Sequence, residues 1–309
     1  MHTRKAIIYT IILLLAAIFV AVTYIFGERL SGKFMAWDET RRLTAAGADP
    51  RHINPPAQSD DFDGPLSPVW KFNTINGDGQ IGRAPAFHNT TVVIQDGSLT
   101  ITQNFDPDFE HEKPGRGEPA GQRYNNASLI GFLGYQPIPG QDVLFESKIQ
   151  LSSNFYGSAG FVIQPQGTLL ADGSFHGRFD NQAFTMFGIG FIGPESNMHG
   201  KNGTTLERVI NWWPEDVEEL DVDMHKLHTY LLRLHWVDPQ TWLGTISVDG
   251  QPLSSMSMPP LGPLEVHIWG DNYSVSTSAL GITTIAHQNG ETKWIRFDSV
   301  SAWPETVPK

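Results

Sequence analysis

The stretch His228-Thr-Tyr-Leu-Leu-Arg-Leu-His-Trp236 is the clearest indication of how this chain folds. Apolar and aromatic side chains recur at every second position from Tyr230 to Trp236, whereas Arg233 and His235 occupy positions between them. Alternation with a period of two is typical of a strand that buries one face. The stretch therefore predicts a half-buried β-strand over residues 228–236.

The sequence on either side of this strand has the same period. Residues 143–151 alternate in polarity, and residues 243–249 alternate and then reach Asp249-Gly250, a favoured two-residue hairpin turn. Further strands bounded by Gly, Pro, Asn or Asp are expected at 91–95, 98–103, 128–134, 158–164, 184–192, 264–269 and 293–301.

Composition supports an all-β domain. Only 17% of the residues are charged, the chain contains 30 Gly and 21 Pro, and no long amphipathic pattern follows residue 47. Residues 107–122 and parts of 193–226 and 270–292 are read as loops. Many short strands without intervening helices favour a jelly-roll sandwich of two antiparallel sheets, here over residues 59–305.

The N-terminal segment predicts a membrane anchor. Residues 6–26 contain no charge and are long enough to cross a hydrocarbon core of about 30 Å as a helix. A cleaved signal peptide is the alternative, although its apolar region is normally shorter. Residues 1–5 form a short basic head, which predicts a single span with an extracytoplasmic C-terminal domain. Residues 27–58 are expected to form a juxtamembrane helix, ending at Gly47, and a short stalk.

Net charge and cysteine content exclude several functions. The formal charge of −12 and the lack of Lys and Arg clusters argue against a nucleic-acid partner. Since the chain has no Cys, it has no disulfide, lipidated cysteine, thiolate zinc site or cysteine nucleophile.

Three phrases, taken in order, resemble the concanavalin A-like lectin/glucanase superfamily. They are Asp60-Asp-Phe-Asp-Gly-Pro-Leu-Ser-Pro-Val-Trp70, the strand at 228–236 with Ser247-Val-Asp-Gly-Gln251, and Ile295-Arg-Phe-Asp-Ser-Val300. The resemblance spans most of residues 60–303 and implies the concanavalin-like sandwich. It also implies glycan binding on the concave face of one sheet, but a fold by itself does not establish a site.

The resemblance implies a catalytic strand in the hydrolase members, of the form E-x-D-x-E or E-x-D-x-x-E. The nearest match is Glu219-Leu-Asp-Val-Asp223, in which the last carboxylate is Asp and therefore has a shorter reach. It also lies in an acidic run over 214–224 that reads as a solvated loop. Asp221 and the isolated Glu195 are further candidates, but we assign no residue a catalytic role.

Aromatic residues beside amides and carboxylates are better material for binding a sugar. Aromatic faces stack on sugar C–H groups, while Asp and Asn exchange hydrogen bonds with hydroxyls. The candidate ligand-binding residues lie at 211–213 and 269–273: Trp212, Trp213, Trp269, Asp271, Asn272 and Tyr273. Structural packing is the alternative role for each tryptophan.

Four aspartates make a candidate Ca²⁺ site. Asp60, Asp61 and Asp63 precede the first strand and Asp298 lies on the last, so they would meet if those strands pair. Capping of a turn is the ordinary alternative for such residues. Histidine spacing predicts no zinc site.

Three functions remain open. The first is a surface-displayed, non-catalytic module that binds a glycan or envelope polysaccharide. The second is a membrane-anchored glycoside hydrolase with divergent carboxylates, and the third is a structural envelope protein.

Overall fold

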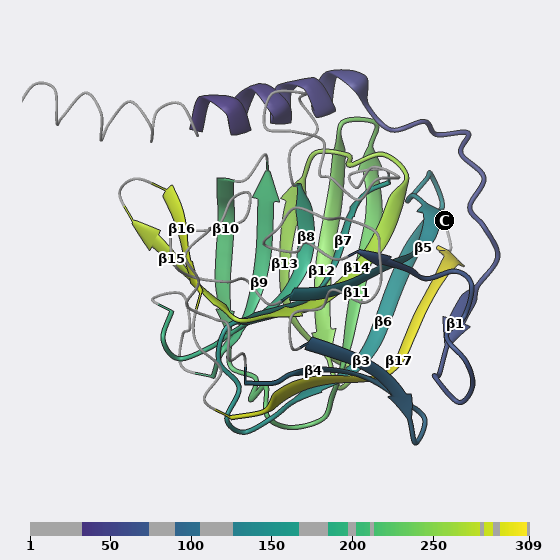
Figure 1. Ribbon diagram of the computed structural model, residues 1–309. Coiled ribbons are helices and arrows are strands. Elements are labelled where there is room, and N and C mark those ends of the chain that lie inside the picture. The colour runs from purple at the N-terminus through teal and green to yellow at the C-terminus, as the bar shows by residue number, and fades with distance from the viewer. Residues whose placement is uncertain are drawn as a thin grey trace, which may run out of the picture.

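The computed structural model describes residues 33–73, 90–105, 126–166, 185–196, 202–210, 213–278, 281–286 and 291–307 (Figure 1). The predicted membrane span at 6–26 lies outside these residues. Among the described residues, none of the helices combines the length and the apolar character that a membrane crossing requires.

Within the described part of the chain, one helix, over residues 33–46, precedes the strands. The strands are β1 (Gln58–Asp60), β2 (Lys71–Asn73), β3 (Thr90–Gln95), β4 (Ser98–Gln103), β5 (Asn126–Tyr135), β6 (Gln141–Leu151), β7 (Ser158–Pro165), β8 (Met186–Ile192), β9 (Thr204–Ile210), β10 (Trp213–Leu220), β11 (His228–Asp238), β12 (Thr241–Val248), β13 (Gln251–Met258), β14 (Leu264–Asp271), β15 (Tyr273–Ser278), β16 (Gly281–Ala286) and β17 (Lys293–Thr306).

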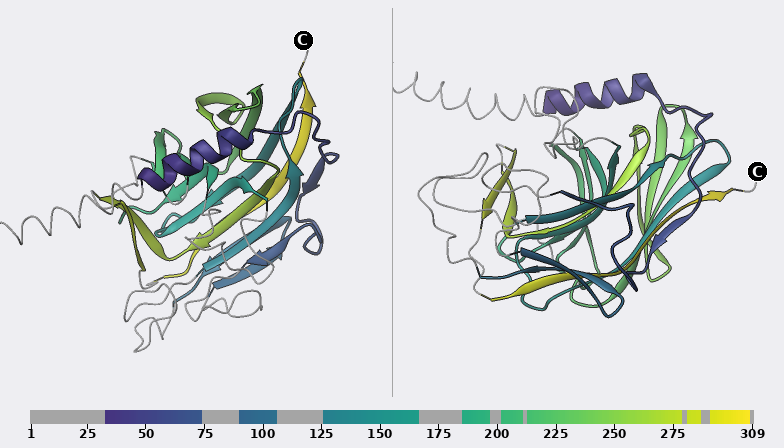
Figure 2. Two further views of the ribbon diagram at one scale, coloured as in Figure 1. Left: turned by 90° about the horizontal axis from the view of Figure 1, so that it is seen from above. Right: turned by 45° about the vertical axis from the view of Figure 1, so that its right-hand side comes forward.

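The described strands form two large antiparallel sheets (Figures 1 and 2). The eight-stranded sheet has the order β13-β12-β11-β6-β17-β4-β3, with β1 paired to β17, and the seven-stranded sheet has the order β10-β9-β8-β7-β14-β5-β2. Strands β15 and β16 make a separate hairpin. The predicted all-β sandwich of two antiparallel sheets is confirmed.

The core lies between the two sheets. Tyr230, Leu232 and Leu234 of β11 are fully buried and pack in the same cluster as Phe161 and Phe187 of the opposite sheet. The alternation quoted from residues 228–236 therefore predicted the buried face correctly. The turn at Asp249-Gly250 is also confirmed, since both residues have the positive φ, 50° and 76°, that a type I′ turn requires.

Most of the acidic run is a strand, so its reading as a loop was wrong for residues 214–220. Residues 213–220 form β10, which pairs with β9 at the edge of the seven-stranded sheet. Only Leu220 of the four residues 217–220 is buried. Among the described strands, β10 has a neighbour on one side only, and charges on such an edge strand oppose edge-to-edge association.

The N-terminal segment is fastened to the sandwich. Gly47, with φ +64°, ends the helix and donates its N–H to the Leu43 carbonyl, as predicted for a left-handed cap. Beyond it, Asn54 exchanges hydrogen bonds with the backbone of Gln136 at 2.7 and 2.8 Å, and the Tyr135 hydroxyl donates to Pro56 O. Residues 47–57 thus run along the domain and lead directly into β1.

Candidate functional site on the outer face of the seven-stranded sheet

The candidate site lies on the face of the seven-stranded sheet that is turned away from the core, called here the outer face. Along each strand, alternate side chains enter the core, as Ile268 of β14 and Leu206 of β9 do. The residues between them therefore point outward. On the four central strands these are Ser158, Gly160, Val162 and Gln164; Met186, Gly188, Gly190 and Ile192; Thr205, Glu207 and Val209; and Glu265, His267, Trp269 and Asp271.

Two glycines on neighbouring strands make room for two large side chains of the outer face. Gly160 of β7 is directly paired with Gly190 of β8. A β-carbon on Gly160 would stand 2.6 Å from Cζ2 of Trp269 and closer still to Cη2, so the indole lies over this glycine. A β-carbon on Gly190 would stand 2.6 Å from Cδ of Glu207. Because the β-carbon positions of directly paired residues are about 4.5–5.5 Å apart, the indole and the carboxylate are neighbours.

Glu207 is a carboxylic acid in a nearly dry position. The residue is 6% exposed, and burial raises the pKa of its carboxyl although the Thr205 hydroxyl, which donates to Oε1 at 2.8 Å, opposes the shift. Burial disfavours the charged form of a carboxyl. The group therefore holds its proton to a higher pH than an exposed glutamate does.

His267 is the second titratable group on this face. Burial lowers the pKa of its imidazole to about 3, so the ring is neutral at ordinary pH. Neither ring nitrogen has a hydrogen-bond partner among the described residues, and the ring lies 5.1 Å, centroid to centroid, from that of Trp269. Trp269 itself packs on an apolar patch of Val162, Met186 and Val209 and is half buried.

A polar chain leads from Trp269 to the end of the sheet. The indole Nε1–H donates to Ser158 Oγ at 3.4 Å, and Asp271 accepts from the Ser158 hydroxyl at 2.8 Å and from its backbone N–H at 3.0 Å. Asp271 is 1% exposed. Two of the sequence-predicted ligand residues, Trp269 and Asp271, are thus brought together.

A buried lysine adjoins this chain. Lys293, at the start of β17, donates to the carbonyls of Tyr156 and Asp271, and its ammonium lies 3.5 Å from the centroid of the Tyr156 ring. Burial lowers the pKa of Lys293 to about 7, against the opposing attraction of Asp271 and Glu195. The carboxylate of Glu195 accepts the backbone N–H of Gly157. Glu195 is therefore a neighbour of Lys293, held by this hydrogen bond, and helps to keep its ammonium charged.

The three carboxylates of the catalytic-motif candidate do not act together. Glu219 of β10 points to the outer face, where it is exposed and directly opposite Thr205. Asp221 accepts from the Asn202 side chain, whereas Asp223 accepts the His225 N–H and pairs with Lys226 at 3.3 Å. Of the three, only Glu219 shares a sheet face with Trp269.

The other predicted ligand residues are less informative. Trp212 lies outside the described residues, and so do the side chains of Trp213, which begins β10, and Tyr273, which begins β15. Asn272 is fully buried at the corner between β14 and β15.

Three of the four aspartates of the predicted Ca²⁺ site, Asp60, Asp61 and Asp298, bind groups of the protein itself. Asp60 accepts from the N–H groups of Phe62 and Ser67 and from the indole of Trp70, at 3.0–3.3 Å. Asp61 accepts the N–H of Asp63, and Asp298 pairs with Arg296 at 2.9 Å. Within the described residues, no three His, Cys, Asp or Glu side chains are arranged to hold a metal ion.

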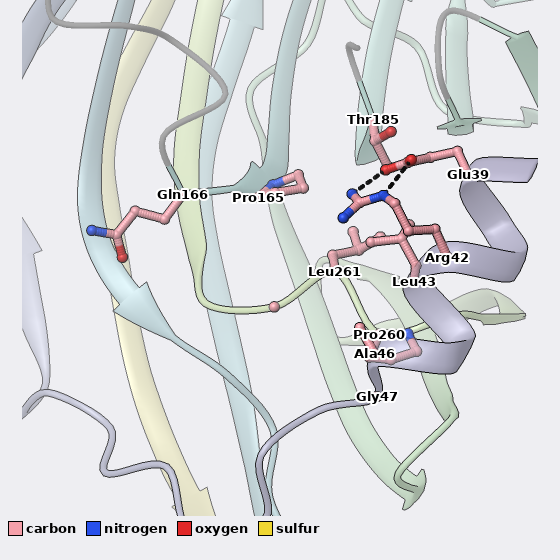
Figure 3. Close-up of a pocket in the computed structure, with 11 residues that line it drawn as sticks. Glu39, Arg42, Leu43, Ala46, Gly47, Pro165, Gln166, Thr185, Pro260 and Leu261 are labelled. Carbon is pink, nitrogen blue, oxygen red and sulfur yellow. Dashed lines mark hydrogen bonds and ion pairs between the residues drawn. The ribbon is translucent and has the colours of Figure 1, made fainter. Parts of the chain in front are cut away.

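A cavity of about 220 Å³ lies beside the helix of residues 33–46 (Figure 3). Leu43, Pro165 and Leu261 give it apolar walls, and Arg42 forms a two-pronged ion pair with Glu39 at 2.6 and 2.7 Å. Because the charges of Arg42 and Glu39 neutralise each other, neither is left to bind a charged ligand in the cavity. It is best understood as part of the contact between helix and sandwich.

Glu207, His267 and Lys293 were missed by sequence reasoning. The available signal was the run Phe187-Gly-Ile-Gly-Phe191, where bulky residues alternate with glycine in a predicted strand. Such a pattern leaves space on one face of the sheet for side chains from neighbouring strands. Which side chains would fill that space depends on strand order.

Comparison with known proteins gives a fold. No family model and no curated protein sequence matches. Among solved structures, a LamA variant from Zobellia galactanivorans in complex with laminaritriose and laminaritetraose has a TM-score of 0.53 at 12% identity, covering 81% of this chain and all of that one. A κ-carrageenase from Pseudoalteromonas carrageenovora (TM-score 0.49, 15% identity, 82% and 98% covered) and the Lotus tetragonolobus seed lectin (0.44, 9%, 82% and 100%) are also similar. The chain has the fold of the concanavalin A-like lectins and glucanases.

Proposed function

We propose that this chain is a membrane-tethered module that binds a carbohydrate on the outer face of its seven-stranded sheet. The observation that carries the proposal is the pairing of Trp269 with Glu207 over Gly160 and Gly190. An aromatic plane beside a hydrogen-bonding carboxyl is the combination that recognises a sugar ring, whose C–H face is apolar and whose edge is polar. Lectins and glycoside hydrolases share this fold, which supports the class of ligand.

The tether is the segment of residues 6–26, which carries no charge over a membrane-spanning length. With the basic head at residues 1–5 retained in the cytoplasm, the sandwich would face outward, toward glycans of the cell envelope or surface. This assignment rests on the sequence alone.

Binding can be tested with the full chain in lipid nanodiscs on a glycan array. We expect Trp269→Ala to abolish binding of whichever glycan the native chain retains, because the stacking surface is lost. Trp303→Ala is the matched control, since Trp303 is also half buried but lies on the eight-stranded sheet. Absence of binding to any glycan, or full binding by Trp269→Ala, would refute the proposal.

One observation favours hydrolysis as a second candidate function. Glu207 pairs with Val217 and Thr205 pairs with Glu219, so the two glutamates are diagonal neighbours on β9 and β10, with Cα atoms about 7–8 Å apart. One is buried with a raised pKa and the other is exposed. Two carboxyl groups that differ in this way can serve as the acid and the base of an inverting glycosidase.

Hydrolysis and binding predict different effects of two substitutions. If Glu207 and Glu219 cleave a glycan, Glu207→Gln and Glu219→Gln will each abolish release of reducing ends while the glycan still binds. If the module only binds, the native chain will release none from a glycan that it retains. Cleavage that survives both substitutions would exclude this pair as the catalytic groups.

A further inference from the structure

The helix of residues 33–46 presents two large aromatic side chains to solvent. Phe34 is 63% exposed and Trp37 is 55% exposed, with ring centroids 5.7 Å apart. The guanidinium of Arg41 lies 5.6 Å from the centroid of the Trp37 ring. With 3.6 residues per turn, these three side chains lie on one side of the helix, called here the aromatic face.

The opposite side of the helix is committed to the sandwich. Ala36 is fully buried, and Leu43 belongs to the main core cluster. Glu39, 5% exposed, is ion-paired with Arg42 beside the cavity, and the chain after the helix is held by a hydrogen bond from Ala48 N–H to Pro239 O. The helix therefore cannot turn Phe34 and Trp37 into the protein without losing these contacts.

The neighbouring sequence suggests what covers the aromatic face. The uncharged segment ends at Phe26, seven residues before Lys33, the first residue of the helix that the structure describes. At no more than about 3.6 Å per residue, Lys33 lies within about 25 Å of the end of that segment. Aromatic rings prefer the headgroup level of a bilayer, and Lys and Arg beside them are attracted to anionic lipids.

We propose that the aromatic face, made of Phe34, Trp37 and Arg41, docks in the headgroup region of the membrane that residues 6–26 enter. The proposal rests on the proposed tether and adds an orientation to it. The helix lies across one end of the sandwich (Figures 1 and 2), next to Pro165 and Leu261. That end of the domain would therefore face the lipid.

Docking would set the direction in which the candidate sugar site opens. Leu264 pairs with Pro165 at the end of the sheet beside the helix, and Trp269 follows five residues later along β14. At about 3.3 Å per residue, Trp269 lies about 16 Å along β14 from that end. The site would therefore open beside the membrane without being covered by it.

Because the chain has no cysteine, single labels can test the proposal cleanly. The full chain would be reconstituted in vesicles of phosphatidylcholine and phosphatidylglycerol as Phe34→Cys, Trp37→Cys or Val93→Cys, each carrying an environment-sensitive fluorophore. Val93 is the control, since it is 44% exposed but lies on β3, at the edge of the eight-stranded sheet. We expect labels at 34 and 37 to emit at shorter wavelength and to be quenched several-fold more strongly by headgroup nitroxide lipids than the label at 93.

The outcomes separate docking from tethering. Equal quenching at all three positions, in chains that stay with the vesicles through an alkaline carbonate wash, would overturn docking and leave the tether standing. Loss of the chain in that wash would refute the tether, and docking with it. Two labels on the aromatic face guard against the failure of one variant to fold.

Discussion

Replacing Gly160 with alanine should push the Trp269 indole out of its place. The new β-carbon would stand 2.6 Å from Cζ2 and closer to Cη2, whereas carbon atoms in good contact are about 3.5–4.0 Å apart, so the ring must retreat by at least about 1 Å. Its contacts with Val162, Met186 and Val209 and its hydrogen bond to Ser158 would loosen. Overpacking of this kind typically costs about 1–3 kcal/mol of unfolding free energy.

The cause can be isolated with a double-mutant cycle. Urea denaturation of the full chain in nonionic detergent would give the unfolding free energies of the native chain, Gly160→Ala, Trp269→Ala and the double variant. In the Trp269→Ala background the clash is gone, so Gly160→Ala should cost less than about 0.5 kcal/mol, and the cycle should show coupling. Gly64→Ala is the control, because no atom lies within 4 Å of the β-carbon it would add. An equal cost of Gly160→Ala in both backgrounds would refute the placement of Trp269 over this glycine.

Three further predictions follow from buried polar groups. Burial raises the pKa of Glu207 in the folded chain, so its favourable contribution is complete below the ordinary pKa of 4.5 and is lost as pH rises through the folded pKa. The unfolding free energy of Glu207→Gln should therefore rise relative to that of the native chain as pH increases from 4 to 8. Denaturation measured across this range would contradict the prediction if the difference between the two unfolding free energies stayed constant. Burial lowers the pKa of Lys293 from 10.5 to about 7, so the unfolding free energy of the native chain should rise with pH between pH 7 and pH 10.5. This rise should disappear in Lys293→Met, and the same rise in both chains would count against the prediction. Asp60→Ala removes the acceptor of three hydrogen bonds and should lower the unfolding free energy by about 1–3 kcal/mol for each donor left unsatisfied. Asp61 is exposed, so Asp61→Ala should cost little. Comparable thermal midpoints for the two variants would show that the hydrogen bonds of Asp60 do not stabilise this turn.

Local pattern was sufficient to predict the strands that bury a full face. Tyr230, Leu232 and Leu234 follow the period of two because side chains in a strand alternate between core and outside. Asp249-Gly250 predicted a turn because both residues tolerate positive φ. The cap at Gly47 has the same basis. Each of these depends only on neighbours in the sequence.

The candidate site depended on strand order, which no local pattern contains. Glu207 and Trp269 become neighbours because β9, β8, β7 and β14 are consecutive in the sheet and because the two glycines between them carry no side chain. Likewise, the acidic residues 214–220 form a strand because their backbone pairs with β9. The sequence by itself therefore determined the sandwich and the uncharged segment at 6–26, since both follow from local periodicity and composition. Only the tertiary structure decided which aromatic and which carboxyl stand side by side, because that depends on hydrogen-bonded pairing between segments far apart in the chain.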